Sequence, residues 1–279
     1  MASSRPLGDA PDRSYADKLE RFARFAEPEL KQIFAGFGLS PGAAVLDLGC
    51  GTGLSTGWLA QACGGEGRVI GADLSLLHLQ AARRDEGFAI VQADAAHPCF
   101  GPRTFDLIWC CNTMNHVADP LDALAALRPL LQPFGRLVLA QGGFVSEMFF
   151  AWDKALDEAV RAACHRCYRE RYGLTSADTA RSRGLVGQML AAGFRDVRVH
   201  THVIERMQPL SPADRDYFRV AIFDGVWGSR IRPYLAPEEW NQLQRYCEAG
   251  SRDYCLDRAD FHHIQTLTVC EGREMRAPR

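Results

Sequence analysis

The feature that most constrains the fold is the stretch Ala44–Gly53, where a short apolar run meets a set of closely spaced glycines. Ala44–Leu46 has the character of a buried strand, and Asp47 follows it directly. Glycine then occupies three alternate positions, at Gly49, Gly51 and Gly53. Leu54–Ala62 continues with the spacing of a helix. Open α/β sheets bind a cofactor at such a strand, turn and helix, because glycine lets a ligand approach the bare backbone.

The spacing of these glycines, and the acid before them, limit the class of cofactor. Dinucleotide-binding turns usually follow the pattern Gly-x-Gly-x-x-Gly and face a pyrophosphate. Here the pattern is Gly-x-Gly-x-Gly, and Asp47 stands two residues before its first glycine. A fixed carboxylate repels a pyrophosphate but attracts an ammonium or a sulfonium group. We therefore expect a cationic nucleoside at this turn, and an NAD-dependent reductase is disfavoured.

The stretch resembles the first motif of the class I S-adenosylmethionine-dependent methyltransferases, in which an acid precedes Gly-x-Gly-x-Gly. The resemblance extends from about Gly38 to Gly142 with further motifs in the expected order, and it is best for small-molecule enzymes of the ubiquinone-biosynthesis type. It implies an α/β, Rossmann-like fold with a seven-stranded, mostly parallel sheet, an antiparallel last strand, helices on both faces and helical lid insertions. It also implies S-adenosylmethionine as the cofactor.

A second acid stands where a ribose would bind. Arg68–Ala72 is predicted to be the second strand, and Asp73 at its end lies 20 residues beyond Gly53. A carboxylate in this position accepts hydrogen bonds from ribose hydroxyls, since each of its oxygens can take one. The alternative is that Asp73 caps the helix expected after it.

The family resemblance implies the remaining cofactor contacts. Asp94, after the predicted third strand Phe88–Gln92, matches the acid that contacts the adenine amine, with a neighbouring backbone amide on the ring; the alternative is a solvated turn aspartate. Tyr15, on an N-terminal helix, would reach the cofactor, or that helix merely packs on the sheet. The expected cofactor-binding residues are Asp47, Gly49, Cys50, Gly51, Thr52, Gly53, Asp73, Leu74, Asp94, Ala95, Asn112 and Tyr15.

The predicted fourth strand, Phe105–Cys111, leads into the expected reaction centre, because ligands lie beyond the carboxyl ends of the strands in open α/β sheets. Asn112 is expected to contact the methionine part of the cofactor, or Asn115 to orient the substrate. The sequence His116-Val117 is similar to the end of this motif in ubiquinone-type enzymes. His116 is the candidate catalytic base for a phenol or enol, since imidazole titrates near neutral pH; the alternative is a packing histidine.

The chain is expected to form one methyltransferase domain over residues 14–279, preceded by a disordered tail at 1–13. Within it we expect N-terminal helices at 14–37 and a cofactor-binding core at 38–142. Lid helices are expected at 144–175, and further helices, inserted before the last strand, at 211–255.

The composition of the chain limits the classes of partner that we expect. The net charge of −2, from 32 basic and 34 acidic residues, gives no reason to expect a nucleic acid or an anionic membrane. The ten cysteines lack a regular framework, and the first residues carry no secretory signal, so we expect reduced thiols in the cytoplasm. The lone pair Cys164 and Cys167 is too few for a structural metal site, and no metal is expected.

The sequence therefore predicts a methyltransferase that acts on an O, N or C nucleophile of a small molecule by in-line displacement. A quinone, a polyketide or another secondary metabolite is favoured as the acceptor. The alternative is a protein that binds S-adenosylmethionine without transferring methyl, as a regulatory subunit or as a rearrangement enzyme on the same fold.

Overall fold

The structure is a computed structural model that describes residues 13–64, 67–82, 87–143, 148–172 and 181–274. Its contacts divide the chain into two compact units. The core unit holds the described residues within 13–141, 181–202 and 268–274, and the inserted unit holds those within 142–172 and 203–267. The expected disordered tail lies outside the described residues, except for its last residue, Arg13, which begins a helix.

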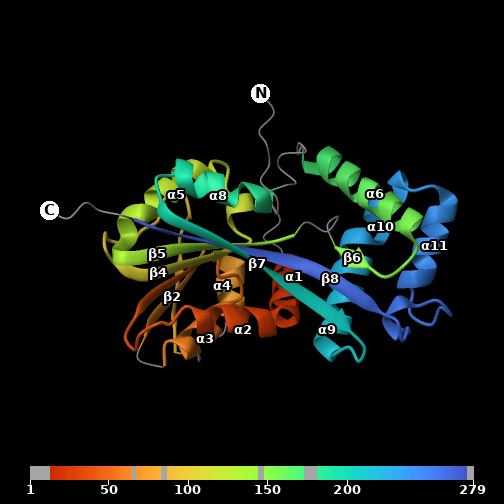
Figure 1. Ribbon diagram of the computed structural model, residues 1–279, viewed down its shortest axis with the longest axis horizontal. Coiled ribbons are helices and arrows are strands. Elements are labelled where there is room, and N and C mark those ends of the chain that lie inside the picture. The colour runs from red at the N-terminus through yellow and green to blue at the C-terminus, as the bar shows by residue number, and fades with distance from the viewer. Residues whose placement is uncertain (1–12, 65–66, 83–86, 144–147, 173–180, 275–279) are drawn as a thin grey trace. The chain divides into compact units, whose positions relative to one another are not determined.

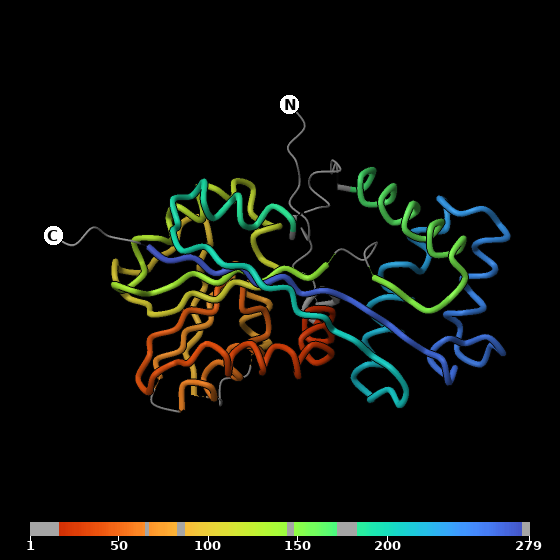
Figure 2. The backbone as a smooth tube through the Cα atoms, in the orientation of Figure 1, coloured from red at the N-terminus to blue at the C-terminus, as the bar shows by residue number. Residues whose placement is uncertain are grey.

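The described strands form one mostly parallel sheet with antiparallel last strands, which confirms the α/β class. Their order in the core unit is β3-β2-β1-β4-β5-β8, and β7 also pairs with β8 (Figure 1). The bounds are β1 Ala44–Leu48, β2 Arg68–Asp73, β3 Ala89–Gln92, β4 Phe105–Cys111, β5 Leu131–Gly142, β7 Arg195–Met207 and β8 His262–Arg273. The long strands β7 and β8 run side by side in Figure 2, and the boundary between the two units falls within both.

Helices cover both faces of the core sheet, with α5 and α8 on one face and α2 and α3 on the other (Figure 1). The bounds are α1 Arg13–Phe25, α2 Glu27–Gly36, α3 Leu54–Ala62, α4 Leu76–Ala81, α5 Pro120–Leu127 and α8 Arg181–Ala191, with short 3-10 helices η1 Met114–His116 and η2 Arg128–Leu130. Strand β1 is buried along its whole length. The ring of Phe34 on α2 meets the buried Trp109 of β4 edge to face at 5.1 Å, a favoured aromatic geometry.

Local sequence signals set several boundaries where they were expected. The chain divides α1 from α2 at Ala26, beside the predicted break at Glu27-Pro28. Helix α3 has the predicted bounds. Pro129 falls in η2, so that α5 ends in a 3-10 turn, because proline lacks the amide that an α-helix interior needs.

One strand was not expected. The sheet has eight strands among the described residues rather than seven, because β6, Phe149–Phe150, pairs antiparallel with β8 in the inserted unit. These residues fall in the stretch 144–175 expected to hold lid helices, of which 144–147 and 173–175 lie outside the described residues. Helix α6, Lys154–Tyr172, begins only after Asp153, whose Oδ1 accepts the amide of Leu156 at 3.0 Å as a helix cap does.

The inserted unit has its own aromatic core. Its other elements are α9 Pro212–Asp216, η4 Tyr217–Trp227, α10 Gly228–Ile231, η5 Arg232–Tyr234, α11 Pro237–Cys247 and η6 Cys255–Asp257. The rings of Phe150, Phe218, Phe223, Trp227 and Phe261 are all buried. Within 211–255 the first helix is expected near Pro212–Val226, and most of this range forms a π-helix, η4, which apolar spacing alone does not distinguish from an α-helix. That these helices form a lid stays a prediction.

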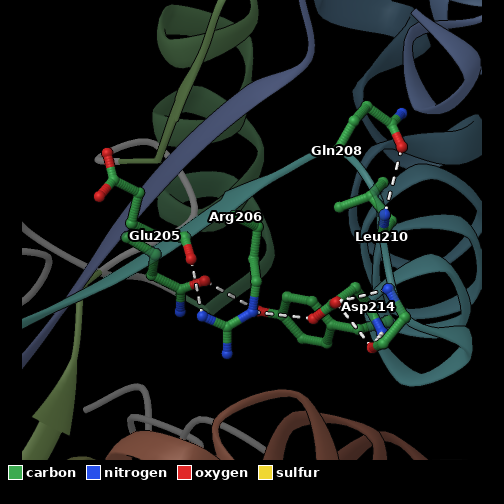
Figure 3. A network of polar contacts seen from close by, with 8 residues as sticks. Glu205, Arg206, Gln208, Leu210 and Asp214 are labelled. Carbon is green, nitrogen blue, oxygen red and sulfur yellow. Dashed lines mark hydrogen bonds and ion pairs between the residues drawn. The ribbon is translucent and has the colours of Figure 1, made fainter. Parts of the chain in front are cut away.

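A largely buried ion pair links the end of β7 to α9 within the inserted unit. Arg206 Nε lies 2.8 Å from Oδ1 of Asp214, and the two side chains are 12% and 11% exposed (Figure 3). Asp214 Oδ2 also accepts the amide of Ser211 at 2.9 Å, in a capping box that begins α9. Gln208 donates from Nε2 to the carbonyl of Leu256 at 2.8 Å. Asp214 therefore serves as both a helix cap and a counter-ion.

Candidate functional site

The glycine turn after β1 is held against the end of β2. Its three glycines have φ of +79° at Gly49, +56° at Gly51 and +80° at Gly53, a left-handed conformation that other residues rarely adopt. The amides of Gly49 and Cys50 donate to the carbonyl of Ala72 at 2.7 and 3.0 Å. A Cβ on Gly49 would overlap Oγ1 of Thr113 and lie 2.5 Å from its Cγ2. The turn therefore presents bare backbone beside the end of β4.

Asp73 joins this turn to the helix that follows β2. Its Oδ2 accepts the amide of Gly51 at 2.9 Å, and its Oδ1 accepts the amide of Ser75 at 2.8 Å. Burial alone would raise the pKa of Asp73, but contacts with His78 and with these two amides outweigh it and hold the pKa below its usual value. The cap of α4 is Ser75. Asp73 is thus a fixed anion whose remaining lone pairs can accept a hydroxyl.

Asp47 is buried beneath the turn. Its side chain accepts a hydrogen bond from Oγ1 of Thr56 at 2.7 Å, and the residue is 2% exposed. Burial raises the pKa of Asp47 to about 7, the Thr56 hydrogen bond opposes this, and the charge of Asp73 adds to it. The attraction for a cation that the sequence suggests therefore depends on pH near neutrality.

The residues expected around the adenine lie at the ends of β2 and β3. Leu74 is 66% exposed, directly after Asp73. Asp94 Oδ1 accepts the amide of Ala96 at 2.9 Å, and its Oδ2 lies 3.3 Å from Nδ1 of His97. Ala95 is buried. One oxygen of Asp94 thus stabilises the turn that contains it, and the carboxylate as a whole is partly exposed to solvent.

An amide pair links the ends of β4 and β5. Asn112 has φ of +52°, and Gln141 donates from Nε2 to its Oδ1 at 2.9 Å. A non-glycine residue in this conformation carries strain that clusters at functional sites. His116 and Asn115 follow on η1, where the amide of His116 donates to the carbonyl of Thr113 at 2.9 Å. Nothing in the sequence motif singled out Gln141, because it lies just beyond the apolar part of its strand.

Some expected residues have other surroundings. Tyr15 belongs to α1, but its side chain lies outside the described residues. The thiol of Cys50 is buried, which raises its pKa, so it is not a nucleophile. Thr52 is half-buried beside it. Cys164 and Cys167 are both buried on α6, and the described residues contain no cluster able to hold a metal ion.

These residues fit the group that the sequence implies. Bare backbone at the glycine turn permits close approach, and the fixed Asp73 carboxylate suits vicinal hydroxyls. Expected site residues follow β1, β2, β3 and β4, at the carboxyl edge of a parallel sheet.

Within the described part of the chain, no helix is both long and apolar enough to cross a membrane.

Sequence comparison places the chain among methyltransferases. Residues 46–139 match the model of a methyltransferase domain. The chain is 30% identical over 223 residues to methyltransferase GfsG of Streptomyces halstedii, covering 76% of this chain and 73% of that protein. It is 38% identical over 111 residues to the ubiquinone/menaquinone biosynthesis C-methyltransferase UbiE of Teredinibacter turnerae, covering 37% of this chain and 45% of that protein. An uncharacterized 37.1 kDa protein of Streptomyces fradiae is 35% identical over 163 residues, 55% of this chain and 44% of its own length. The chain thus spans less than half of two of these three relatives.

Solved structures share the fold at low sequence identity. Phosphoethanolamine N-methyltransferase 2 of Haemonchus contortus, in complex with S-adenosyl-L-methionine, has a TM-score of 0.56 at 15% identity, over 99% of this chain and 61% of that chain. The [4+2]-cyclase SpnF has a TM-score of 0.51 at 16% identity, over 89% of this chain and 82% of that chain. Fold, cofactor-binding turn and the relationship to GfsG agree: the chain belongs to the class I S-adenosylmethionine-dependent methyltransferases.

Proposed function

We propose that the chain methylates an O, N or C nucleophile of a small molecule, and that the acceptor is a quinone, a polyketide or another secondary metabolite. The observation that carries the proposal is the bond from the Gly51 amide to Oδ2 of Asp73, 2.9 Å long, which fixes an anion at the glycine turn. A quinone acceptor is supported by the name of one relative, UbiE, and an oxygen nucleophile by that of another, the O-methyltransferase cnsE of Penicillium expansum. The net charge of −2 argues against a nucleic acid as substrate.

Several of the expected site residues have a proposed role in holding the cofactor. Asp73 would bind the ribose hydroxyls, and Asp94 with the backbone of Ala95 would bind the adenine, next to the exposed Leu74. Asn112, whose oxygen Gln141 occupies, would meet the methionine part. When bound, S-adenosylmethionine supplies a methyl group activated by its sulfonium. The chain's own task is then to align the acceptor with that methyl group and to exclude water.

A proton has to leave when the acceptor is a phenol or an enol. His116 stands on η1, directly beyond the end of β4, and its Nε2 is the proposed proton acceptor. An amine or a carbon acceptor places different demands on this position. The role of His116 therefore depends on the acceptor, whereas the roles of the cofactor-binding residues are the same for every acceptor.

Titration calorimetry with S-adenosylmethionine and S-adenosylhomocysteine tests the site. We expect micromolar binding that Asp73→Ala weakens about tenfold or more, the ~1.4 kcal/mol scale of a hydrogen bond to a charged group. Asp122→Ala, an exposed acid on α5, is the matched control and should bind like the wild type. A screen of acceptors with methyl-labelled cofactor follows. Binding without transfer to any phenol, quinone, amine or polyketide would favour the alternative of a non-transferring S-adenosylmethionine protein.

The cysteines bear on where this reaction takes place. All ten are free thiols, and seven of them are buried: Cys50, Cys63, Cys110, Cys164, Cys167, Cys255 and Cys270. Free thiols suit a reducing compartment. We therefore propose that the protein works in the cytoplasm, and fractionation of the source cells would test this.

A further inference from the structure

A buried imidazole lies beside the proposed ribose-binding acid. His78 belongs to α4, is 5% exposed, and places Nδ1 3.4 Å from Oδ1 of Asp73. The separation is long for a hydrogen bond but within the range of an ion pair. Leucine is the most frequent residue around it in the chain, at Leu74, Leu76, Leu77 and Leu79. Nothing in this pattern predicts a partner for the histidine.

The position of His78 follows from how α4 begins. Oγ of Ser75 accepts the amide of His78 at 3.3 Å, which starts the helix two residues after Asp73. The first turn of α4 then carries the imidazole back toward the end of β2. A histidine at a buried site loses its hydration, and a leucine would fill the same space without that loss. A polar group at this buried site therefore points to a task beyond packing.

Few described charged groups surround this pair. Helix α4 packs against α1, β2 and β3. The charged or titratable residues with described side chains on these elements are Asp17, Lys18, Glu20, Arg21, Arg24, Arg68 and Asp73. Arg24 is paired with Glu20 at 2.6 Å. Asp47, near the end of β1, is also close, and its charge raises rather than lowers the pKa of Cys50 on the glycine turn. Among the ionisable side chains near Asp73, it is His78 whose contact lowers the pKa of that carboxyl.

The imidazole acts on the same oxygen that the Ser75 amide holds. Oδ1 of Asp73 meets the Ser75 amide and His78, while Oδ2 meets the Gly51 amide. Donors on both oxygens fix the plane of the carboxylate, and they leave acceptor capacity mainly on Oδ2, at the glycine turn. Without the imidazole, the desolvated Oδ1 would lose one of its two described contacts.

We propose that His78 is a positioning residue for ribose recognition: it fixes the Asp73 carboxylate in the orientation, and in the charged state, that accepts the ribose hydroxyls of the cofactor. The inference rests on the proposed role of Asp73. It adds a residue that acts through Asp73 and touches neither the cofactor nor the acceptor.

Two amide variants separate positioning from packing. The amide nitrogen of asparagine can take the place of Nδ1, whereas that of glutamine reaches the place of Nε2. We expect His78→Asn to bind S-adenosylhomocysteine within about twofold of the wild type, and His78→Gln and His78→Leu to bind about five- to tenfold more weakly, the scale of one charge-assisted hydrogen bond. In the Asp73→Asn background, His78→Leu should cause no further loss. The turnover number at saturating cofactor should stay unchanged, so the effect falls on KM.

Calorimetric titration of all variants, with thermal melting to confirm folding, decides the matter. Equal affinity of His78→Gln and wild type would overturn the inference, as would equal losses in His78→Asn and His78→Gln. A full loss from His78→Leu in the Asp73→Asn background would show that His78 acts through packing and would also overturn it. If His78→Leu does not fold, the asparagine and glutamine pair carries the test. A wild type that does not bind, or an Asp73→Asn variant that binds normally, would instead refute the proposed function of the site, and this inference with it.

Discussion

Substituting Gly49 should show how much of the requirement for glycine at this position comes from its backbone conformation and how much from steric overlap with Thr113. Gly49 has φ of +79°, and a Cβ there would overlap Oγ1 of Thr113 and lie 2.5 Å from Cγ2 and 2.8 Å from Cβ of that residue. Gly42 offers a matched control. It has φ of +82°, and a Cβ there would meet nothing within 4 Å. The two alanine variants therefore share the backbone strain and differ in the clash.

The magnitudes follow from these two terms. Forcing an alanine into the left-handed region costs about 1–2 kcal/mol, which is the whole effect expected for Gly42→Ala. Overpacking a filled site adds about 1–3 kcal/mol, so Gly49→Ala should lose about 2–5 kcal/mol in the free energy of unfolding. Thr113→Gly removes every atom that the new Cβ would overlap. In that background, Gly49→Ala should cost no more than Gly42→Ala.

Urea unfolding of the four proteins in this cycle, with Gly42→Ala alongside, measures the terms. Cofactor affinity measured on the folded fraction should fall with Gly49→Ala, since the turn must shift, but not with Gly42→Ala. Equal destabilisation by Gly42→Ala and Gly49→Ala would refute the steric argument. A loss from Gly49→Ala that persists in full beside Thr113→Gly would show that the turn is confined by something other than the end of β4.

Three further predictions test the charges and hydrogen bonds of individual side chains in and beyond the site. Burial raises the pKa of Asp47 from 3.8 to about 7, so its contribution to stability is fully present below about pH 4 and is lost as the pH rises through 7. The free energy of unfolding of Asp47→Asn should therefore rise relative to that of the wild type by roughly 2–4 kcal/mol between pH 5 and pH 8. A difference in Tm between the two proteins that does not depend on pH would contradict this. Arg206→Met leaves the buried Asp214 without its counter-ion and should cost about 2–3 kcal/mol in urea unfolding, whereas Arg198→Met, at an exposed ion pair, should cost under about 0.5 kcal/mol. Gln141→Leu should weaken binding of S-adenosylhomocysteine several-fold while leaving 5′-methylthioadenosine, which lacks the amino and carboxyl groups, unchanged; equal losses for both ligands would place the effect outside Asn112.

Strong local signals explain which parts of the fold the sequence predicts well. Apolar runs in β1 and β4, and the glycine-bounded start of α3, determine those elements without reference to the rest of the chain. The strand β6 is missed because two aromatic residues beside a long helix carry no period of their own. The π-helix η4 is missed because its buried face has nearly the spacing of an α-helix.

The candidate site likewise contains residues that the sequence predicts and contacts that it does not. Asp73 was identified because its distance from the glycines is a property of the chain, and the structure adds the bond to Gly51. The environment of Asp47 was not predictable, because the residue that donates a hydrogen bond to it, Thr56, lies on a helix whose rotation only tertiary packing decides. His78 is hidden for a related reason: periodicity places it on a buried face but does not say which group lies opposite.

The two acids at the glycine turn illustrate how packing separates groups that look alike in the sequence. Both lie at or near the carboxyl end of a strand, and both are largely buried. Asp73 meets two amides and an imidazole, which keep it an anion. Burial and the charge of Asp73 raise the pKa of Asp47 to about 7, and the single hydroxyl that donates to Asp47 only partly opposes this rise. A permanent anion suits hydroxyl recognition, and a carboxyl that titrates near pH 7 suits a ligand whose own charge changes during the reaction. The difference in hydrogen-bond donors, more than the presence of either acid, therefore sets what this turn can bind.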